Sequence, residues 1–338
     1  MNVVNEFLKR GFLVSPDVID IIKDKNIDDI TSKLGSADIV LTKNLYNYIT
    51  RGPSVKIISE YKKDTSPKRI TYFLDFYNNR LNVLRNILKE KVEFKDTTSI
   101  NKLNYGSEAT IIGMVRDIRE NGFKIEDSTG SVFCITSEKV LEDEVLGLKG
   151  KVEKDGFFVN KIYYPDISLN KKVNLTKDDA FVLFTEKLNK TPSHEYSYIF
   201  TFETNRGILR DLKTEVVTTG NEVNYPNIYT PTEPFLVDIK GVKIFVLKIK
   251  WIEDLKKKLN ENDPKKIITT LLRKRHFYPF EFISGDPYLL KDVPDIVFVS
   301  GLGEHFFLNY KGVSIVSVEG ERGFIVNLKD REYKEASD

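Results

Sequence analysis

Cysteine and histidine are scarce in this chain of 338 residues, which contains one cysteine and three histidines. A single cysteine cannot form an intramolecular disulfide, and Cys134 lies in the alternating apolar stretch VFCIT, where a buried thiol is the expected state. The sequence has no C-x-x-C pair, so a structural zinc site of the paired-cysteine type lacks support. This cysteine usage indicates a reducing compartment.

The chain also lacks a dominant charge and a long hydrophobic run. Its 52 Lys and Arg residues are balanced by 50 Asp and Glu residues, so no global field attracts nucleic acid and any such binding must be local. No stretch approaches the roughly 18 apolar residues of a membrane-spanning helix, and the segment MNVVNEFLKRGF has no apolar signal core. We therefore expect a cytoplasmic protein with no membrane partner.

Two common catalytic signatures are missing as well. The sequence contains neither G-x-x-x-x-G-K-[ST] nor G-x-S-x-G, so neither a P-loop nucleotide hydrolase nor a serine-hydrolase elbow has support. The composition, with 41% hydrophobic and 30% charged residues, is that of an ordinary globular protein. A chain of this length is expected to form two or three domains.

The first part of the chain has the pattern of short helices. Val4 and Phe7 follow helical spacing, Ser15-Pro16-Asp17 marks the start of a second helix, and a third helix fits residues 41–49. We predict a small helical domain over residues 1–60. A unit of this size has too little core to be strongly stable alone, so it is expected to dock on something else.

Residues 61–100 are rich in basic and aromatic side chains, and apolar spacing predicts a helix over about residues 70–88. Basic residues mixed with aromatics can bind a strand of nucleic acid by charge and stacking. The alternative is a linker helix whose aromatics pack and whose lysines are solvated. We assign this range as linker and helix and leave both roles open.

Between residues 101 and 170 the pattern changes to five short alternating strands separated by hairpin turns, which predicts a small closed barrel. The stretch TIIGMVRDIRENG followed by FKIEDSTGSVFCI resembles an oligonucleotide-binding (OB) barrel. Such barrels bind single strands through cations and aromatics near the second and third strands, although many are structural spacers. The candidate contacts with nucleic acid are Arg116, Arg119, Phe123, Lys124 and Lys139.

From residue 171 to about 330 the chain alternates apolar runs such as AFVLF, YIFTF and DIVFVS with helical or loop stretches. Runs rich in Val, Ile and Phe with helices between them predict a sheet buried on both faces. The charged end of the chain, residues 331–338, is expected to be a frayed tail.

Three blocks in this part carry a family resemblance: EPFLVDIKGVKIFVLKIKWIEDL, IITTLLRKRHFYPF and DVPDIVFVSGLGEHFFLNYKGVSIVSVEG. In order and spacing they resemble the phosphoesterase domain of the archaeal D-family DNA polymerase small subunits, which is calcineurin-like. That family also places a helical domain and an OB barrel before the phosphoesterase. The resemblance implies a multidomain α+β protein with a small helical N-terminal domain, an OB-fold β-barrel and a degenerate calcineurin-like phosphoesterase α/β sandwich.

The family's chemistry requires two divalent metals held by Asp, His and Asn at strand ends, and the sequence departs from this pattern. Glu186 and Leu188 stand at the Asp and His of the family's D-x-H motif. Lys248 or Ile249 stands at the His of Y-H-G. The stretch YIFTFETNRG lacks the Gly-Asp that should bridge the metals.

Two further motifs are also altered. In the family's G-H-x-H motif both histidines are replaced, by Leu302 and Glu304. In its G-N-[HC]-D motif Asn221 persists, whereas Glu222 and Val223 replace the polar partners. The resemblance therefore implies a phosphoesterase framework with no catalytic residue, no metal and no cofactor.

The three histidines, His194, His276 and His305, are too few for the family's site. A shifted single-metal site built from Glu186, Asn221, Glu304 and His305 remains an alternative. His305 lies one residue past its motif and should point to the other side of a strand, and His276 is expected to have a structural, hydrogen-bonding role.

The resemblance implies a non-catalytic accessory or scaffold subunit of an archaeal replicative DNA polymerase, holding a catalytic large subunit of the B or the D family. One alternative is a stand-alone factor for single-stranded DNA, whose binding would be sensitive to salt. Another is a residual metal-dependent 3′-5′ exonuclease.

Overall fold

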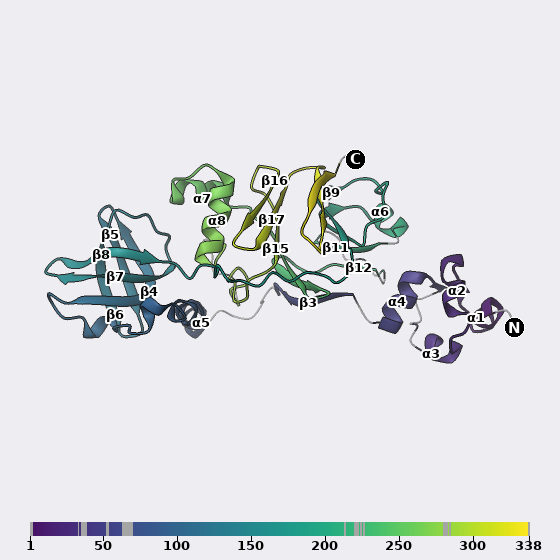
Figure 1. Cartoon of the computed structure of the whole chain (residues 1–338), viewed down its shortest axis with the longest axis horizontal. Helices are drawn as coiled ribbons and strands as arrows, with labels where there is room; N and C mark the ends of the chain where they lie inside the picture. Colours follow the sequence, from purple (N-terminus) through teal and green to yellow (C-terminus); the bar gives the residue numbers. More distant parts are fainter. Residues whose placement is uncertain are drawn as a thin grey trace.

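The structure is a computed structural model of the chain, and it describes residues 3–32, 34, 39–51, 54–62, 70–212, 214–219, 223, 225, 227–279, 283 and 285–336. In Figure 1 a β-barrel and a small helical unit lie at opposite ends of the molecule, with a two-sheet sandwich between them. Among the described residues, no helix is both long and apolar enough to cross a membrane.

The N-terminal unit is helical, as its periodicity predicts. Its elements are α1 (Val3–Lys9), β1 (Leu13–Val14), η1 (Pro16–Val18), α2 (Ile19–Ile22), α3 (Ile27–Thr31), β2 (Val40–Leu41) and α4 (Lys43–Arg51). Pro16 opens η1, and the Asn26 side chain caps α3 by accepting bonds from two backbone N–H groups. Phe7, Ile22 and Leu41 are fully buried in the core of this unit.

The strand β3 (Val55–Glu60) corrects the prediction of a helical domain that extends to residue 60. It pairs antiparallel with β13 (Phe235–Ile239) and is an outer strand of a six-stranded sheet. Val55 is buried in the core of that sheet. The β-branched run VKIIS suits a strand, but its partner lies about 180 residues further along the chain, which local sequence does not reveal.

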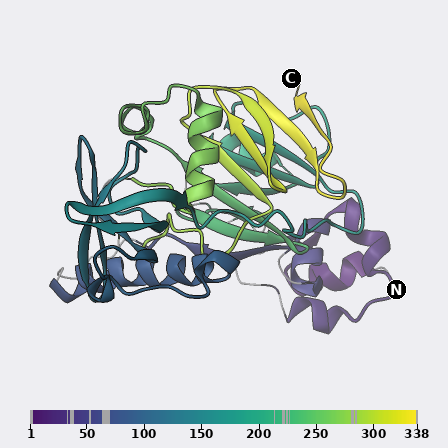
Figure 2. The same ribbon diagram turned by 60° about the vertical axis from the view of Figure 1, so that its left-hand side comes forward.

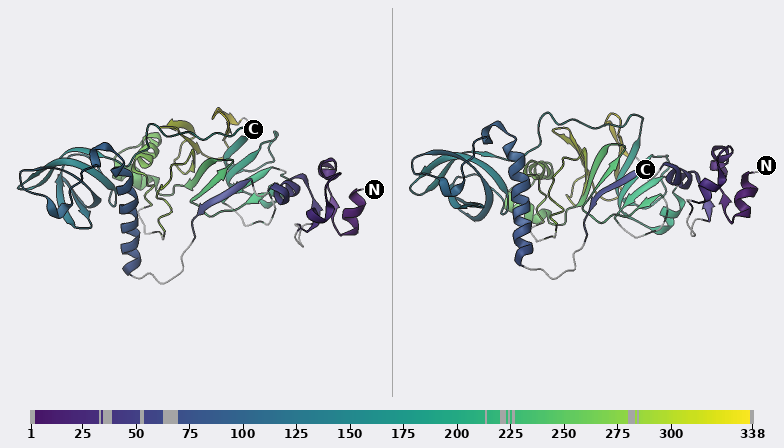
Figure 3. Two further views of the ribbon diagram at one scale, coloured as in Figure 1. Left: turned by 60° about the horizontal axis from the view of Figure 1, so that its bottom comes forward. Right: turned by 90° about the horizontal axis from the view of Figure 1, so that it is seen from below.

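The helix α5 (Ile70–Lys89) packs against the barrel, and two short turns follow it, η2 (Val92–Phe94) and η3 (Ile100–Lys102). Leu84 and Leu88 of α5 are fully buried, and they belong to one apolar cluster with Ile112 and Met114 of the barrel. Figure 3 shows α5 lying along one side of the barrel. The predicted helix is therefore present, and its apolar face covers the barrel.

The five predicted strands form a closed barrel in the order β4-β5-β6-β8-β7. Their bounds are β4 (Glu108–Arg119), β5 (Gly122–Asp127), β6 (Gly130–Ile135), β7 (Val145–Glu153) and β8 (Gly156–Tyr163). Alternate residues point inward, so Phe123, Ile125 and Cys134 fill the interior. The Asp127 carboxylate accepts bonds from the backbone of Thr129 and Gly130 and fixes the hairpin between β5 and β6.

The remaining strands form two mixed six-stranded sheets. The first has the order β12-β11-β10-β9-β18-β19 and the second β16-β17-β15-β14-β13-β3. The bounds are β9 (Phe181–Leu188), β10 (Tyr198–Thr204), β11 (Glu215–Thr218), β12 (Ile228–Tyr229), β14 (Val242–Lys248), β15 (Ile296–Ser300), β16 (Phe306–Tyr310), β17 (Val313–Val318), β18 (Gly323–Asn327) and β19 (Tyr333–Ala336).

The two sheets pack face to face around an aromatic core that includes Phe184, Phe200 and Phe298. The helices α7 (Ile252–Leu259) and α8 (Pro264–Lys274) cover the outer face of the second sheet, and α6 (Arg206–Asp211) packs on the outer face of the first (Figure 2). The predicted sheet buried on both faces is therefore two sheets, each with helix on one side.

The prediction of a frayed tail is wrong for Tyr333–Ala336, which form β19 and pair antiparallel with β18. The free edge of β18 offers a row of backbone hydrogen-bonding groups, and these pair with any extended segment regardless of its side chains. The charged sequence YKEA is therefore ordered by its backbone.

Buried ion pairs join the barrel and α5 to the sandwich. Arg80 of α5 donates to Asp286 at 2.8 and 3.1 Å, and both side chains are almost fully buried. Asp286 also bonds His276 Nε2 at 2.8 Å. A second buried pair links Glu144, in the loop before β7, with Lys274 at the end of α8. Because breaking such a pair leaves an uncompensated buried charge, these contacts hold the two parts in one orientation.

Candidate functional site

Three charged side chains meet where strands of the two sheets end. Glu186 lies near the end of β9, Glu203 near the end of the neighbouring β10, and Lys248 is the last residue of β14 in the opposite sheet. Lys248 Nζ lies 3.1 Å from Glu203 Oε1 and 3.4 Å from Glu186 Oε1. One ammonium group therefore connects a carboxylate from each of two adjacent strands across the sandwich. We call these three residues the lysine-bridged cluster.

Glu186 is the most deeply buried member of the cluster, with only 8% of its side chain exposed. Its second carboxylate oxygen, Oε2, accepts a bond of 2.7 Å from the backbone N–H of Gly320. Gly320 has φ 67°, in the left-handed region that glycine adopts at little cost. Both oxygens of Glu186 thus have partners, one a cation and the other a backbone donor.

The pKa shifts of Lys248 and Glu203 both favour the charged form of the side chain. Burial alone would lower the pKa of Lys248, but its bond to Glu203 and the charge of Glu186 raise it above its ordinary value. The bond from Lys248 lowers the pKa of Glu203. Lys187 adds a more distant cation, 3.6 Å from Glu203 Oε2. Lys248 and Glu203 therefore form a charged pair, and the Lys248 ammonium also lies within ion-pair distance of Glu186.

The two leucines at the family's histidine positions lie in apolar clusters. Leu188 packs on the outer face of the first sheet with Leu183, and Leu302 packs beneath α7 and α8 in the second. Ile249, the alternative to Lys248, is also buried, and its backbone N–H donates to Ser300 O. None of these side chains offers a ligand atom. Asn221 and Glu222 lie outside the described residues.

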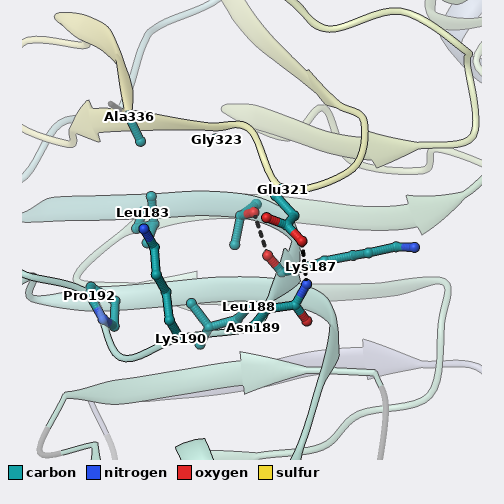
Figure 4. Close-up of a pocket in the computed structure, with 10 residues that line it drawn as sticks. Leu183, Lys187, Leu188, Asn189, Lys190, Pro192, Glu321, Gly323 and Ala336 are labelled. Carbon is teal, nitrogen blue, oxygen red and sulfur yellow. Dashed lines mark hydrogen bonds between the residues drawn. The ribbon is translucent and has the colours of Figure 1, made fainter. Parts of the chain in front are cut away.

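A small pocket lies on the outer face of the first sheet, beside Leu183 and Leu188 (Figure 4). Its volume is about 50 Å³, enough for a few water molecules at most. Asn189 Nδ2 donates to Glu321 Oε1 at 2.7 Å at its rim. The pocket is too small for a nucleotide, so it does not extend the lysine-bridged cluster into a substrate site.

The structure does not bring Glu304 and His305 to the cluster. Glu304 pairs with Lys265 of α8 at 2.6 Å, whereas the ring of His305 stacks on Phe324 with centroids 4.2 Å apart. The two neighbours thus contact different partners, although both lie in the loop before β16 and not in a strand. His276 accepts a bond from the backbone N–H of Tyr278, which is a structural role, and His194 is exposed.

The described residues do not fit the family's two-metal site. A pair of divalent cations needs several oxygen or nitrogen ligands, whereas the positions at hand supply two carboxylates that already neutralise an ammonium. Within the described ranges no group of three or more His, Cys, Asp or Glu side chains is arranged to hold a metal ion. A metal between Glu186 and Glu203 would have to displace Lys248.

Glu203 is the member of the cluster that the sequence reasoning missed. The stretch YIFTFETNRG lacks the family's Gly-Asp pair, but it contains Glu203 as the penultimate residue of β10. Its signal was a single carboxylate at the end of an otherwise apolar strand. Because β9 and β10 are parallel neighbours, their ends meet at the same edge of the sheet, and that adjacency links Glu203 to Glu186.

The barrel residues predicted to contact nucleic acid have different environments. Phe123 is 1% exposed inside the barrel, so it cannot contact a ligand and this prediction is wrong. Arg116 pairs with Asp143 and lies over the ring of Tyr77 at 4.5 Å. Arg119 is exposed but pairs with Asp117. Lys124 and Lys139 are exposed to solvent.

No family model matches the chain. It is 22% identical to the DNA polymerase II small subunit of Archaeoglobus fulgidus, and the alignment covers 93% of this chain and 90% of that protein. The protein of the same name from Pyrococcus abyssi is 38% identical over 30% of this chain and 19% of its own length. The Methanothermobacter thermautotrophicus protein of the same name is 28% identical, and the alignment covers 53% of this chain and 43% of that protein.

Solved structures match parts of the chain. The telomere capping protein Ten1 from Saccharomyces pombe aligns with 19% of this chain and 70% of its own, at 23% identity and a TM-score of 0.17. An archaeal phosphodiesterase aligns with 46% of this chain and 98% of its own, at 11% identity and a TM-score of 0.27.

Proposed function

Because the chain is homologous to the archaeal DNA polymerase II small subunits, we propose that it is a non-catalytic accessory subunit of a replicative DNA polymerase, in which it holds a catalytic large subunit. In this proposal residues 101–170 are an OB-fold unit and residues 171–330 a calcineurin-like phosphoesterase unit that no longer hydrolyses phosphodiesters. The large subunit is of the B or the D family, and the complex works in the cytoplasm.

The loss of catalysis rests on one observation, the lysine-bridged cluster. A phosphoesterase of this family activates water with two metal ions, and in this chain a lysine ammonium lies between the carboxylates at two of the corresponding strand ends. The ammonium offsets part of the charge of the two carboxylates, so it can stabilise their approach without a metal. It carries no bound water of lowered pKa and cannot supply the hydroxide that the reaction needs.

The scaffold role is supported by the rigid connection between the two larger parts. The buried pairs Arg80 with Asp286 and Glu144 with Lys274 connect α5 and the barrel to the sandwich. A partner that contacts both parts would meet a preorganised surface and would not have to order a flexible joint on binding.

The test of this proposal is affinity purification of the tagged protein from its native cells, with quantification of every chain that co-purifies. We expect a polymerase large subunit in roughly equimolar amount, retained in about 0.5 M salt because an obligate interface is large and mainly apolar. A control purification of the untagged strain identifies background chains. Recovery of the tagged protein alone would refute the proposal and favour the stand-alone factor for single-stranded DNA.

A further inference from the structure

An open groove lies at the end of α5, beside the barrel. It is lined by Lys89, Phe94, Lys95, Asp96, Thr97 and Thr98 and has a volume of about 590 Å³. Lys89 and Lys95 are both exposed, and Asp96 is the single acidic residue among the lining residues. The groove thus combines two lysines and two hydroxyl groups on an open surface.

The groove is continuous with the outer face of β7 and β8. Its floor is Phe94, whose ring meets Tyr163 of β8 edge to face with centroids 5.0 Å apart. Gly147 of β7 makes room for that ring, because a Cβ there would lie 2.2 Å from it. On the other side Thr98 N–H donates to Thr110 O of β4 at 2.8 Å.

The next residues on this face are two lysines placed directly opposite each other. Lys149 of β7 is the register partner of Lys161 of β8 and, on its other side, of Thr110. Both lysines are exposed, and Lys161 Nζ lies 4.7 Å from the centroid of the Tyr163 ring. Like charges directly opposite each other destabilise a sheet. A bound anion would relieve that repulsion.

None of these four lysines, Lys89, Lys95, Lys149 and Lys161, forms an ion pair with another residue that the structure describes. In this they differ from Arg116 and Arg119, which are already neutralised by aspartates. They also differ from Lys151, which pairs with Glu153 at 2.7 Å. Four lysines without an acidic partner among the described residues therefore lie along this one path.

An exposed aromatic ring lies at the far end of this path. Phe158 of β8 is 39% exposed and lies diagonally beside Lys149, because its own register partner is Lys151. Phe158 and Tyr163 are five residues apart on β8, about 16 Å at the rise of a strand. An exposed ring beside an unpaired lysine, here Phe158 beside Lys149, is an arrangement in which a base can stack on the ring while a phosphate meets the cation.

We propose that this face of the barrel binds single-stranded nucleic acid without sequence preference. The site, which we name the lysine track, consists of the groove, the pair Lys149 and Lys161, and Phe158. The lysines contact phosphates and Phe158 stacks on a base. An acidic peptide would use the lysines but not the exposed ring, so the combination favours nucleic acid. The site differs from the face of β5 and β6 that the OB resemblance indicated, and it does not depend on the accessory-subunit proposal.

The experiment measures the affinity of the full-length protein for a fluorescein-labelled oligodeoxythymidine of about 20 nucleotides, by anisotropy over a range of salt concentrations. Each phosphate contact to a single strand changes the log–log salt slope by about 0.7. Lys149→Ala/Lys161→Ala should therefore reduce the slope by about 1.4 and weaken binding about 25-fold at roughly 0.1 M salt. Phe158→Ala should weaken binding at least fivefold with an unchanged slope, because stacking carries no salt dependence.

The matched control is Lys172→Ala/Lys177→Ala, which removes the same charge from two exposed positions outside the barrel and should retain affinity within about threefold. Thermal unfolding of each variant confirms that these exposed substitutions leave the fold intact. The proposal is overturned if the wild-type protein does not bind at about 50 mM salt, if the control loses as much affinity as the track variant, or if polyglutamate competes as well as oligodeoxythymidine. None of these outcomes changes the expectation that a polymerase subunit co-purifies with the protein, so this proposal can fail while the accessory-subunit proposal stands.

Discussion

Replacing Lys248 by methionine tests the role of the lysine-bridged cluster. Lys248→Met preserves much of the side-chain volume and removes the ammonium, so Glu186, 8% exposed, keeps only its bond from Gly320. Breaking a fully buried ion pair costs about 3–5 kcal/mol. Because 26% of the Lys248 side chain is exposed and water screens the charge, we expect about 1–3 kcal/mol of lost stability at pH 7. This corresponds to a decrease in Tm of about 5 °C.

The stabilisation that the lysine-bridged cluster contributes depends on pH. The pKa of Glu203 is lowered from its ordinary value of 4.5, so its stabilisation is present above that pH and is lost as the pH falls through the lowered value. The pKa of Lys248 is raised from 10.5, so its stabilisation is present below that pH and is lost as the pH rises through the raised value. The difference in Tm between wild type and Lys248→Met should therefore be largest near neutrality and smaller at about pH 3.

Two further variants make the test specific. Lys250→Met removes a lysine two positions away that is 72% exposed, and it should cost less than about 1 kcal/mol. Glu186→Gln/Lys248→Met removes both charges and should recover part of the lost stability, because a neutral pair leaves no buried charge. If Lys248→Met were no less stable than Lys250→Met, the ammonium would not hold the cluster together.

Three other substitutions address the parts around the cluster. Arg80→Met should cost about 3–5 kcal/mol and speed proteolysis between α5 and the sandwich, because it leaves Asp286 buried without its arginine partner; unchanged Tm and cleavage would contradict this. Burial lowers the pKa of His276 from 6.5 to about 4, so stability should fall from pH 6.5 to pH 4 by up to ~1.4 kcal/mol per pH unit. In His276→Gln the slope of the unfolding free energy against pH, measured by denaturant titrations, should be smaller than in the wild type. An identical slope would refute the role of His276 in this pH dependence. Gly147→Ala should cost about 1–3 kcal/mol by displacing Phe94, whereas Gly130→Ala, whose added Cβ would meet nothing nearer than 3.7 Å, should be tolerated in the same thermal assay.

Local periodicity predicted the barrel strands and α5 because each depends on its own alternation or helical spacing. It failed at β3 and β19, whose strand state comes from a partner elsewhere in the chain, about 180 residues away for β3. The charged YKEA segment shows this most clearly, since its side chains give no indication of a strand. Long-range backbone pairing is not encoded in the residues of one strand alone.

At the candidate site, the sequence identified which of the family's metal ligands are missing, and the structure identified the lysine that lies among the remaining carboxylates. Leu188 and Leu302 could be excluded as ligands from the sequence, and the structure buries both. The sequence left Lys248 and Ile249 open; alternation at the end of β14 turns the lysine toward Glu186 and the isoleucine into the core.

The wrong prediction for Phe123 also reflects the alternation of side chains along a strand. Phe123 and Lys124 are adjacent in β5, so their side chains point to opposite faces and cannot both contact one ligand. The structure places Phe123 inside the barrel and leaves Lys124 exposed. Strand parity, applied to the sequence, would have removed one of the two candidates.

The claim that this framework no longer hydrolyses phosphodiesters is tested most directly by incubating the purified protein with a 3′-labelled single strand and Mn²⁺, beside Glu186→Gln as a matched control. We expect no cleavage by the wild-type protein above the level of that variant, because Lys248 holds both carboxylates. Cleavage that requires Mn²⁺ and disappears in Glu186→Gln would show that a metal displaces Lys248, and it would contradict the non-catalytic assignment.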